Sequence, residues 1–113
     1  MKRVLIGIVS VVALTWAGAA FAQDAKAKGE KVFADQKCSL CHSIAGKGNA
    51  KGPLDDVGSK LKADEIRQWI VNPVEMAAKA KADRKPAMPP KYASLPKDDL
   101  DALVAYLSSL KKS

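Results

Sequence analysis

Apolar residues recur at helical spacing in four segments of this 113-residue chain, and no segment alternates between apolar and polar residues as a strand would. The pattern therefore predicts an all-α fold class. The helices are expected at about residues 24–36, at 63–71, from 73 to a point before Pro86, and from about 96 to about 110.

The first and last of these helices have the clearest apolar faces, so we expect them to pack together. Gly29 lies inside the first one, near Val32 and Phe33 on the same face. Because a glycine costs roughly 1 kcal/mol in a helix interior, its presence indicates that another element approaches closely there. The apolar stripe of the last helix consists of Leu100, Leu103, Val104, Leu107 and Leu110.

The segments between the helices are rich in residues that interrupt regular structure. Residues 43–60 contain many Gly, Lys and Pro and are expected to form a loop. Asn72 is placed to cap the third helix, with Pro73 at its first position and Glu75 placed for a capping box. Residues 86–90 are expected to be extended, because their three prolines fix φ and lack amide donors.

Residues 1–22 are predicted to be a secretory signal peptide. Two basic residues are followed by an apolar run that ends near Trp16, and Ala20-Phe21-Ala22 matches the cleavage pattern of signal peptidase. The alternative is a transmembrane anchor, but the run is shorter than the roughly 20 residues that span a bilayer. We therefore expect a domain of residues 23–113 in the periplasm, without stable insertion in the membrane.

A domain of residues 23–113 has little material for a core. A chain of this size buries only about 60–65% of its unfolded surface, and its two cysteines close a loop too short to restrain it. Small exported domains usually compensate with disulfides, a metal or a cofactor. Something other than side chains is therefore expected in the interior. The aromatic residues of the domain are Phe33, Trp69, Tyr92 and Tyr106.

The chain is basic, with 19 Lys and Arg against 12 Asp and Glu and a formal net charge of +7. Such a balance suits nucleic acids, anionic membranes or acidic proteins. Export argues against nucleic acid, and the lysines are scattered and not interleaved with aromatic residues. Two interpretations remain, a generally solvated lysine surface and a docking face for acidic redox proteins.

The segment Cys38-Ser39-Leu40-Cys41-His42 is the strongest chemical signal. The C-x-x-C-H spacing is typical of c-type haem attachment, in which two thiols bond the vinyl groups and the histidine ligates the iron. A thioredoxin-like redox pair would need a βαβ context, and a zinc site would need ligands beyond the two cysteines and the one histidine of the chain. A plain disulfide is the third alternative. Haem alone also supplies the missing apolar interior.

The second axial ligand follows less directly. His42 is the only histidine, so a second ligand within the chain is Met or Lys, unless the position holds water or stays open. Met88 lies in a proline-rich loop, whereas Met76 lies in a predicted helix where packing explains it. We therefore predict Met88 as the ligand. A neutral thioether favours ferrous over ferric iron and so raises the reduction potential.

The order and spacing of these motifs resemble those of the class I monohaem cytochromes c of small bacterial type. The resemblance implies helices wrapped round one covalent haem c, with the terminal helices crossing where Gly29 and Phe33 meet Tyr106. It extends over the whole domain. The matching segments are Gly29 and Phe33, Cys38-Ser39-Leu40-Cys41-His42, Gly52-Pro53-Leu54, Met88-Pro89-Pro90 and Leu103-Val104-Ala105-Tyr106-Leu107.

The resemblance also assigns roles to residues around the haem. It implies that the carbonyl group of Pro53 accepts the Nδ1 proton of His42. It implies that Trp69 lies at the propionate edge, where its indole N–H can donate a hydrogen bond, although core packing explains it equally well. Arg67, Arg84 and Lys85 are further candidates for neutralising the propionates.

These observations predict a monomeric electron carrier of a respiratory chain and not an enzyme. Its expected partners are acidic redox proteins, a reductase or an oxidase. One alternative is a haem c subunit of a multi-component oxidoreductase. Another is a ligand-binding or peroxidase-like haem protein, which would need an open position on the iron.

Overall fold

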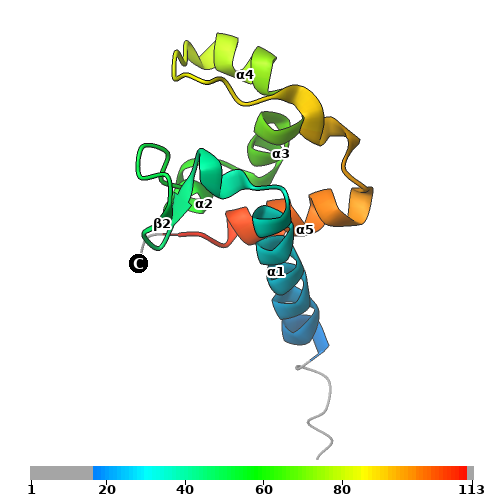
Figure 1. The fold of residues 1–113 in the computed structure, drawn as a ribbon. Coiled ribbons are helices and arrows are strands. Elements are labelled where there is room, and N and C mark those ends of the chain that lie inside the picture. The colour runs from blue at the N-terminus through cyan, green and yellow to red at the C-terminus, as the bar shows by residue number, and fades with distance from the viewer. Residues whose placement is uncertain (1–16, 112–113) are drawn as a thin grey trace, which may run out of the picture.

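The computed structural model describes residues 17–111, with side chains from residue 23 onwards. The all-α fold class is confirmed, because helices dominate the described residues (Figure 1). The elements in chain order are α1 (Ala17–Asp35), the 3-10 helix η1 (Cys38–Leu40), β1 (Ser43–Ile44), β2 (Lys47–Gly48), α2 (Val57–Lys60), α3 (Ala63–Val71), α4 (Pro73–Ala80), the 3-10 helix η2 (Pro90–Ser94) and α5 (Lys97–Ser108).

Helix α1 begins earlier than the sequence pattern indicated, at Ala17 in place of about residue 24. It therefore includes the last residues of the predicted signal peptide, whose residues 1–16 lie outside the described part. Across the described residues, no helix combines the length and the apolar composition that crossing a bilayer requires.

Helices α1 and α5 cross and pack against each other, as predicted (Figure 1). Gly29 lies at the crossing, where an added Cβ would overlap the carbonyl group of Ala102 on α5. Next to it, the rings of Phe33 and Tyr106 meet edge to face with their centroids 6.2 Å apart. The absence of a side chain at Gly29 thus sets how closely the two helices approach.

We expect Gly29→Ala to destabilise the protein by about 1–3 kcal/mol, which lowers Tm by roughly 5–20 °C in a domain of this size. The better helix propensity of alanine offsets at most about 1 kcal/mol, whereas the overlap forces apart two packed backbones. Thermal denaturation followed by circular dichroism measures the change. Glu30→Ala, an exposed neighbour on the same helix, is the control. An unchanged or raised Tm for Gly29→Ala would contradict a tight crossing.

The expectation of a loop over residues 43–60 was wrong in two places. Strands β1 and β2 pair antiparallel, with Ser43 opposite Gly48 and Ile44 opposite Lys47. Their turn is closed by Ala45 and Gly46, both at positive φ. Strands of two residues are too short to show alternation, so no sequence pattern announces them. Further on, the short helix α2 is fixed by the N–H of Gly58, which donates to the carbonyl group of Leu110 at 2.8 Å.

The predicted capping of α4 is only partly correct. Pro73 does occupy the first turn, but the side chain of Asn72 does not cap the helix. Because Asn72 also ends α3, its side chain turns back and donates to Gln68 Oε1 at 2.8 Å. Glu75 pairs with Lys79 one turn later, at 3.1 Å, and forms no capping box.

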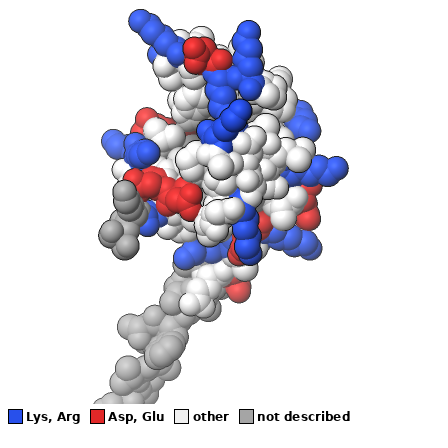
Figure 2. Space-filling model, turned by 60° about the vertical axis from the view of Figure 1, so that its left-hand side comes forward, with Lys and Arg blue, Asp and Glu red and all other residues white. Residues whose placement is uncertain are grey.

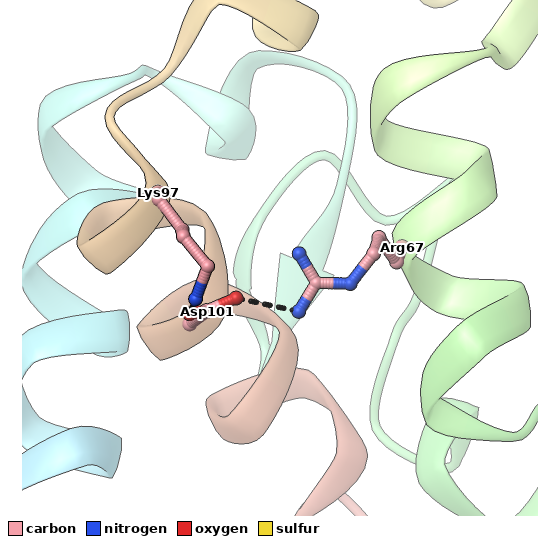
Figure 3. A network of polar contacts seen from close by, with 3 residues as sticks. All are labelled: Arg67, Lys97 and Asp101. Carbon is pink, nitrogen blue, oxygen red and sulfur yellow. Dashed lines mark hydrogen bonds and ion pairs between the residues drawn. The ribbon is translucent and has the colours of Figure 1, made fainter.

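A polar network on the surface joins α3 to α5 (Figure 3). Arg67 on α3 donates to Asp101 Oδ1 on α5 at 2.7 Å, and Lys97 donates to Asp101 Oδ2 at 2.9 Å. The hydrogen bonds from Lys97 and then from Arg67 hold the pKa of Asp101 below its usual value of 3.8. Arg67 is thereby engaged by α5.

We expect Asp101→Asn to lower Tm by a few degrees at most near neutral pH, because exposed ion pairs contribute little. The folded-state pKa of Asp101 is depressed, so its contribution is present above the unfolded-state pKa and is lost as pH falls through the folded-state value. The difference in Tm between wild type and variant should therefore shrink as pH falls below 3.8 and through the depressed folded-state pKa. Asp64→Asn, an exposed carboxylate on α3, serves as the control. A difference that persists in acid would exclude the ion pair as its cause.

The core is formed by α1, α3, η2 and α5, and it is open on one side. Among the described residues, no large side chain is less than 2% exposed. Most of the core residues also line a cavity, so the side chains do not close the interior by themselves. The buried cluster consists of Val32, Phe33, Ile66, Ile70, Tyr92, Leu103, Val104 and Leu107.

Candidate functional site

Two adjoining cavities occupy the interior. The inner one, of about 230 Å³, is walled by apolar core side chains from α1, α3 and α5. The outer one, of about 500 Å³, lies between the haem-type motif, α4 and the segment before η2. Together they have the size of a site for a cofactor. The residues that line both cavities are Cys38, His42, Trp69, Met88 and Tyr92.

The C-x-x-C-H motif forms a tight turn at the edge of this cleft. Lys37, at φ 57°, ends the run of α1, and the 3-10 helix η1 follows directly. The N–H groups of Cys41 and His42 both donate to the carbonyl group of Cys38, at 3.1 and 2.9 Å. Both cysteines are free and half-buried. The turn thus brings two thiols and an imidazole to one edge of the cavities.

Burial governs the protonation of Cys38. Loss of solvent raises the pKa of this thiol from 9.0 to about 11, in spite of a hydrogen bond from its own backbone. At neutral pH the group is therefore a neutral thiol in an apolar wall. A neutral thiol is inert towards most electrophiles until it is deprotonated.

The ring of His42 is oriented by a hydrogen bond to a loop carbonyl group. Its Nδ1 lies 3.1 Å from the carbonyl oxygen of Gly52. Because a carbonyl oxygen can only accept, Nδ1 carries the proton and Nε2 keeps a free lone pair. Burial lowers the pKa of His42, and the nearby charge of Arg84 adds to this effect. A neutral imidazole with a free Nε2 is the form that ligates a metal.

The predicted hydrogen-bond acceptor of His42 was wrong by one residue. The carbonyl group of Gly52, and not that of Pro53, accepts the hydrogen bond from Nδ1. Ser43 and Pro53 form a parallel bridge, in which the N–H of Ser43 donates to Gly52 O and the N–H of Leu54 donates to Ser43 O. Alternate carbonyl groups of an extended segment point to opposite sides. The carbonyl group of Gly52 therefore faces the His42 segment, and that of Pro53 faces away.

Met88 and Trp69, two of the predicted site residues, both lie on the cleft. Both side chains are half-buried and line both cavities, whereas Met76 lines neither. The indole N–H of Trp69 has no hydrogen-bond partner among the described residues, so it is available to a bound group. Of the three propionate candidates, Arg67 is engaged by Asp101 and Arg84 donates to the carbonyl group of Cys41.

Tyr92 is a site residue that the sequence did not single out. It lines both cavities, and its hydroxyl group lies 3.5 Å from the carbonyl oxygen of Gln36 at the end of α1. Burial raises its pKa, with smaller contributions from Cys38 and Cys41. Its position four residues after Met88, just past the two prolines, is the signal that could have placed it beside the cleft.

The residues present fit a haem. An apolar inner wall suits a large hydrophobic ring, and the same cleft is lined by an imidazole and a thioether, two groups that can ligate haem iron. Two thiols at the edge supply the attachment. An apolar cleft with this donor set is typical of the class of c-type haem proteins.

Comparison with known proteins gives the family. The cytochrome c family model matches residues 26–111. The chain therefore belongs to the cytochrome c family, and the cofactor of that family is covalently bound haem c.

A curated relative is cytochrome c oxidase subunit 2 of Alkalihalophilus pseudofirmus, which is 28% identical over 93 residues. The alignment covers 74% of this chain and 25% of that protein, so the chain spans about a quarter of the relative's length. No solved structure matches the chain significantly. The family membership indicates haem-based electron transfer.

Proposed function

We propose that the protein is a single-electron carrier whose one haem is attached at Cys38 and Cys41 and ligated by His42 and Met88. The observation that carries the proposal is that the imidazole and the thioether line the same two cavities as Cys38. The hydrogen bond to Gly52 leaves Nε2 of His42 as the free nitrogen. Met88 occupies the proline-rich segment that closes the outer cavity.

The haem, when bound, supplies an iron that gains or loses one electron. The residues of the chain limit the rearrangement that accompanies this change. Gly52 holds the ring of His42 in one tautomer and one orientation. Apolar side chains such as Ile66, Ile70 and Leu103 exclude water from the inner cavity, so little solvent has to reorganise. Met88, as the second ligand, would leave no open position on the iron for O₂ or peroxide.

We further propose that the protein is exported, cleaved after Ala22 and located in the periplasm. The basic start, the apolar run and the small-residue pattern before Gln23 support this. Covalent attachment suits such a location, since it keeps the cofactor on a protein that has left the cytoplasm. N-terminal sequencing of the purified protein tests the cleavage, with Gln23 as the expected first residue.

We propose that the protein is a monomer and that its partners are acidic redox proteins, which dock on it transiently. Figure 2 shows Lys and Arg side chains gathered over α4 and the segment after it, and others spread round a broad uncharged area. The exposed cations at this end include Lys79, Lys81, Arg84 and Lys85. A positive face speeds encounter with a negative one, so the electron-transfer rate is expected to fall as salt rises.

A second candidate function is that of a haem module that passes electrons within an oxidase. It is favoured by the similarity to one quarter of a cytochrome c oxidase subunit 2. Size-exclusion chromatography of the natively purified protein separates the two candidates. A monomer that exchanges electrons freely supports the carrier, and a stable complex with a catalytic subunit supports the module.

Binding of carbon monoxide tests whether Met88 occupies the second ligand position of the iron. A protein with Met88 on the iron should not bind CO when reduced at neutral pH, so its spectrum should stay unchanged. Rapid CO binding by the wild-type protein would favour the ligand-binding alternative. It would also remove Met88 from the proposed role.

A further inference from the structure

Among the described residues, the segment that carries Met88 donates one side-chain hydrogen bond to the rest of the protein. Residues 83–89 form neither helix nor strand, and two prolines among them lack amide donors. Over the described residues, the only hydrogen bond from this segment is that of Arg84 Nη2 to the carbonyl group of Cys41, at 2.6 Å. This contact bridges 43 positions of sequence.

The guanidinium group also packs on the backbone of Gly52. A Cβ at Gly52 would overlap both Nη1 of Arg84 and the carbonyl oxygen of Cys41. The glycine thus provides the space in which the guanidinium group reaches this carbonyl. Cys41 directly precedes His42, and the carbonyl group of Gly52 accepts the hydrogen bond from Nδ1 of His42. Arg84 therefore contacts both backbone groups that border the imidazole.

We propose that Arg84 is a positioning residue that ties the Met88 segment to the loop carrying His42. The inference rests on the proposed ligation by His42 and Met88. Arg84 lines the outer cavity together with Pro86, Met88 and Pro89, so its contact closes the open side of the cleft. A segment without a backbone ladder opens at low cost, and a charge-assisted hydrogen bond reduces the open population.

The sequence suggested another role for Arg84, the neutralisation of a haem propionate. The two roles differ in what they require of the side chain. A propionate needs a positive charge, which lysine also supplies. The contact with Cys41 and Gly52 uses two nitrogen atoms of a planar fork, which lysine cannot reproduce.

Imidazole is a suitable probe, because it replaces Met88 on ferric iron only when the segment is open. Its apparent affinity is the affinity for the open protein multiplied by the fraction of protein that is open, so a larger open fraction gives tighter apparent binding. We expect Arg84→Gln to raise that affinity roughly three- to tenfold in the holoprotein, as loss of one partly exposed charge-assisted hydrogen bond implies. Arg84→Lys should give a smaller rise. Lys51→Gln removes the same charge from an exposed side chain next to Gly52, one that forms no hydrogen bond or ion pair in the described structure, and should match wild type.

The titrations, followed in the visible spectrum together with the reduction potential, separate the outcomes. Equal imidazole affinities for Arg84→Gln and Lys51→Gln would overturn the inference. Wild-type affinity and potential in Arg84→Lys, with both changed in Arg84→Gln, would also overturn it and assign the residue to a propionate. If Met88→Ala leaves the imidazole affinity unchanged, the proposed ligation fails, and this inference fails with it.

Discussion

Replacing Met88 by alanine is expected to lower the reduction potential by on the order of 0.2 V, within the range of about 0.8 V over which axial ligands set haem potentials. The neutral thioether favours ferrous iron, so its loss stabilises the ferric state. The vacated position should also bind CO in the reduced protein. Redox titration and CO difference spectra measure the two effects.

Met76→Ala is the matched control for this variant. Met76 is half-buried on α4, seven residues before the Met88 segment begins at residue 83, but it lines neither cavity. Its replacement should leave the potential and the CO spectrum as in wild type. If Met76→Ala produced the loss and Met88→Ala did not, the ligand assignment would be wrong.

Replacing Cys38 and Cys41 together by alanine is expected to abolish the cooperative thermal transition. Without its attachment the haem is lost, and the inner cavity of about 230 Å³ remains in the core. At roughly 24 cal/mol per Å³, a closed void of that volume would cost about 5 kcal/mol. This is comparable with the whole net stability of a domain of this size. Calorimetry and acid–organic extraction of haem test the two parts of the prediction.

Ser39→Ala controls for disturbance of the motif itself. Its side chain is exposed between the two cysteines. The N–H of Asn49 donates to the backbone carbonyl group of Ser39, so the substitution leaves this hydrogen bond in place. This variant should keep its haem through extraction and its thermal transition. A colourless double variant that unfolded as cooperatively as wild type would show that the cofactor does not complete the core.

The helices could be predicted where periodicity and end signals agree. Residues 63–71 were placed correctly because their apolar stripe starts beside two acidic residues and stops before Pro73. The start of α1 at Ala17 was missed, because residues 17–22 are uniformly apolar and carry no helical periodicity. The hairpin was missed because two-residue strands leave no alternation to detect.

The site was predictable to the extent that its residues are sequence neighbours. Cys38, Cys41 and His42 form one motif, and their placement on the cleft follows from one turn. The partner of His42 depends on which way a carbonyl group points, which sequence spacing does not encode. The contact between Arg84 and Cys41 spans two loops, so it became visible only in the fold.

The most direct test of the whole account is the optical spectrum of the ferric wild-type protein at neutral pH. Iron held between an imidazole and a thioether is expected to show a weak band at about 695 nm. Its presence, together with a sharp α-band after reduction, would agree with His42 and Met88 on opposite sides of one haem. A haem-loaded protein that lacks the band would contradict this ligation.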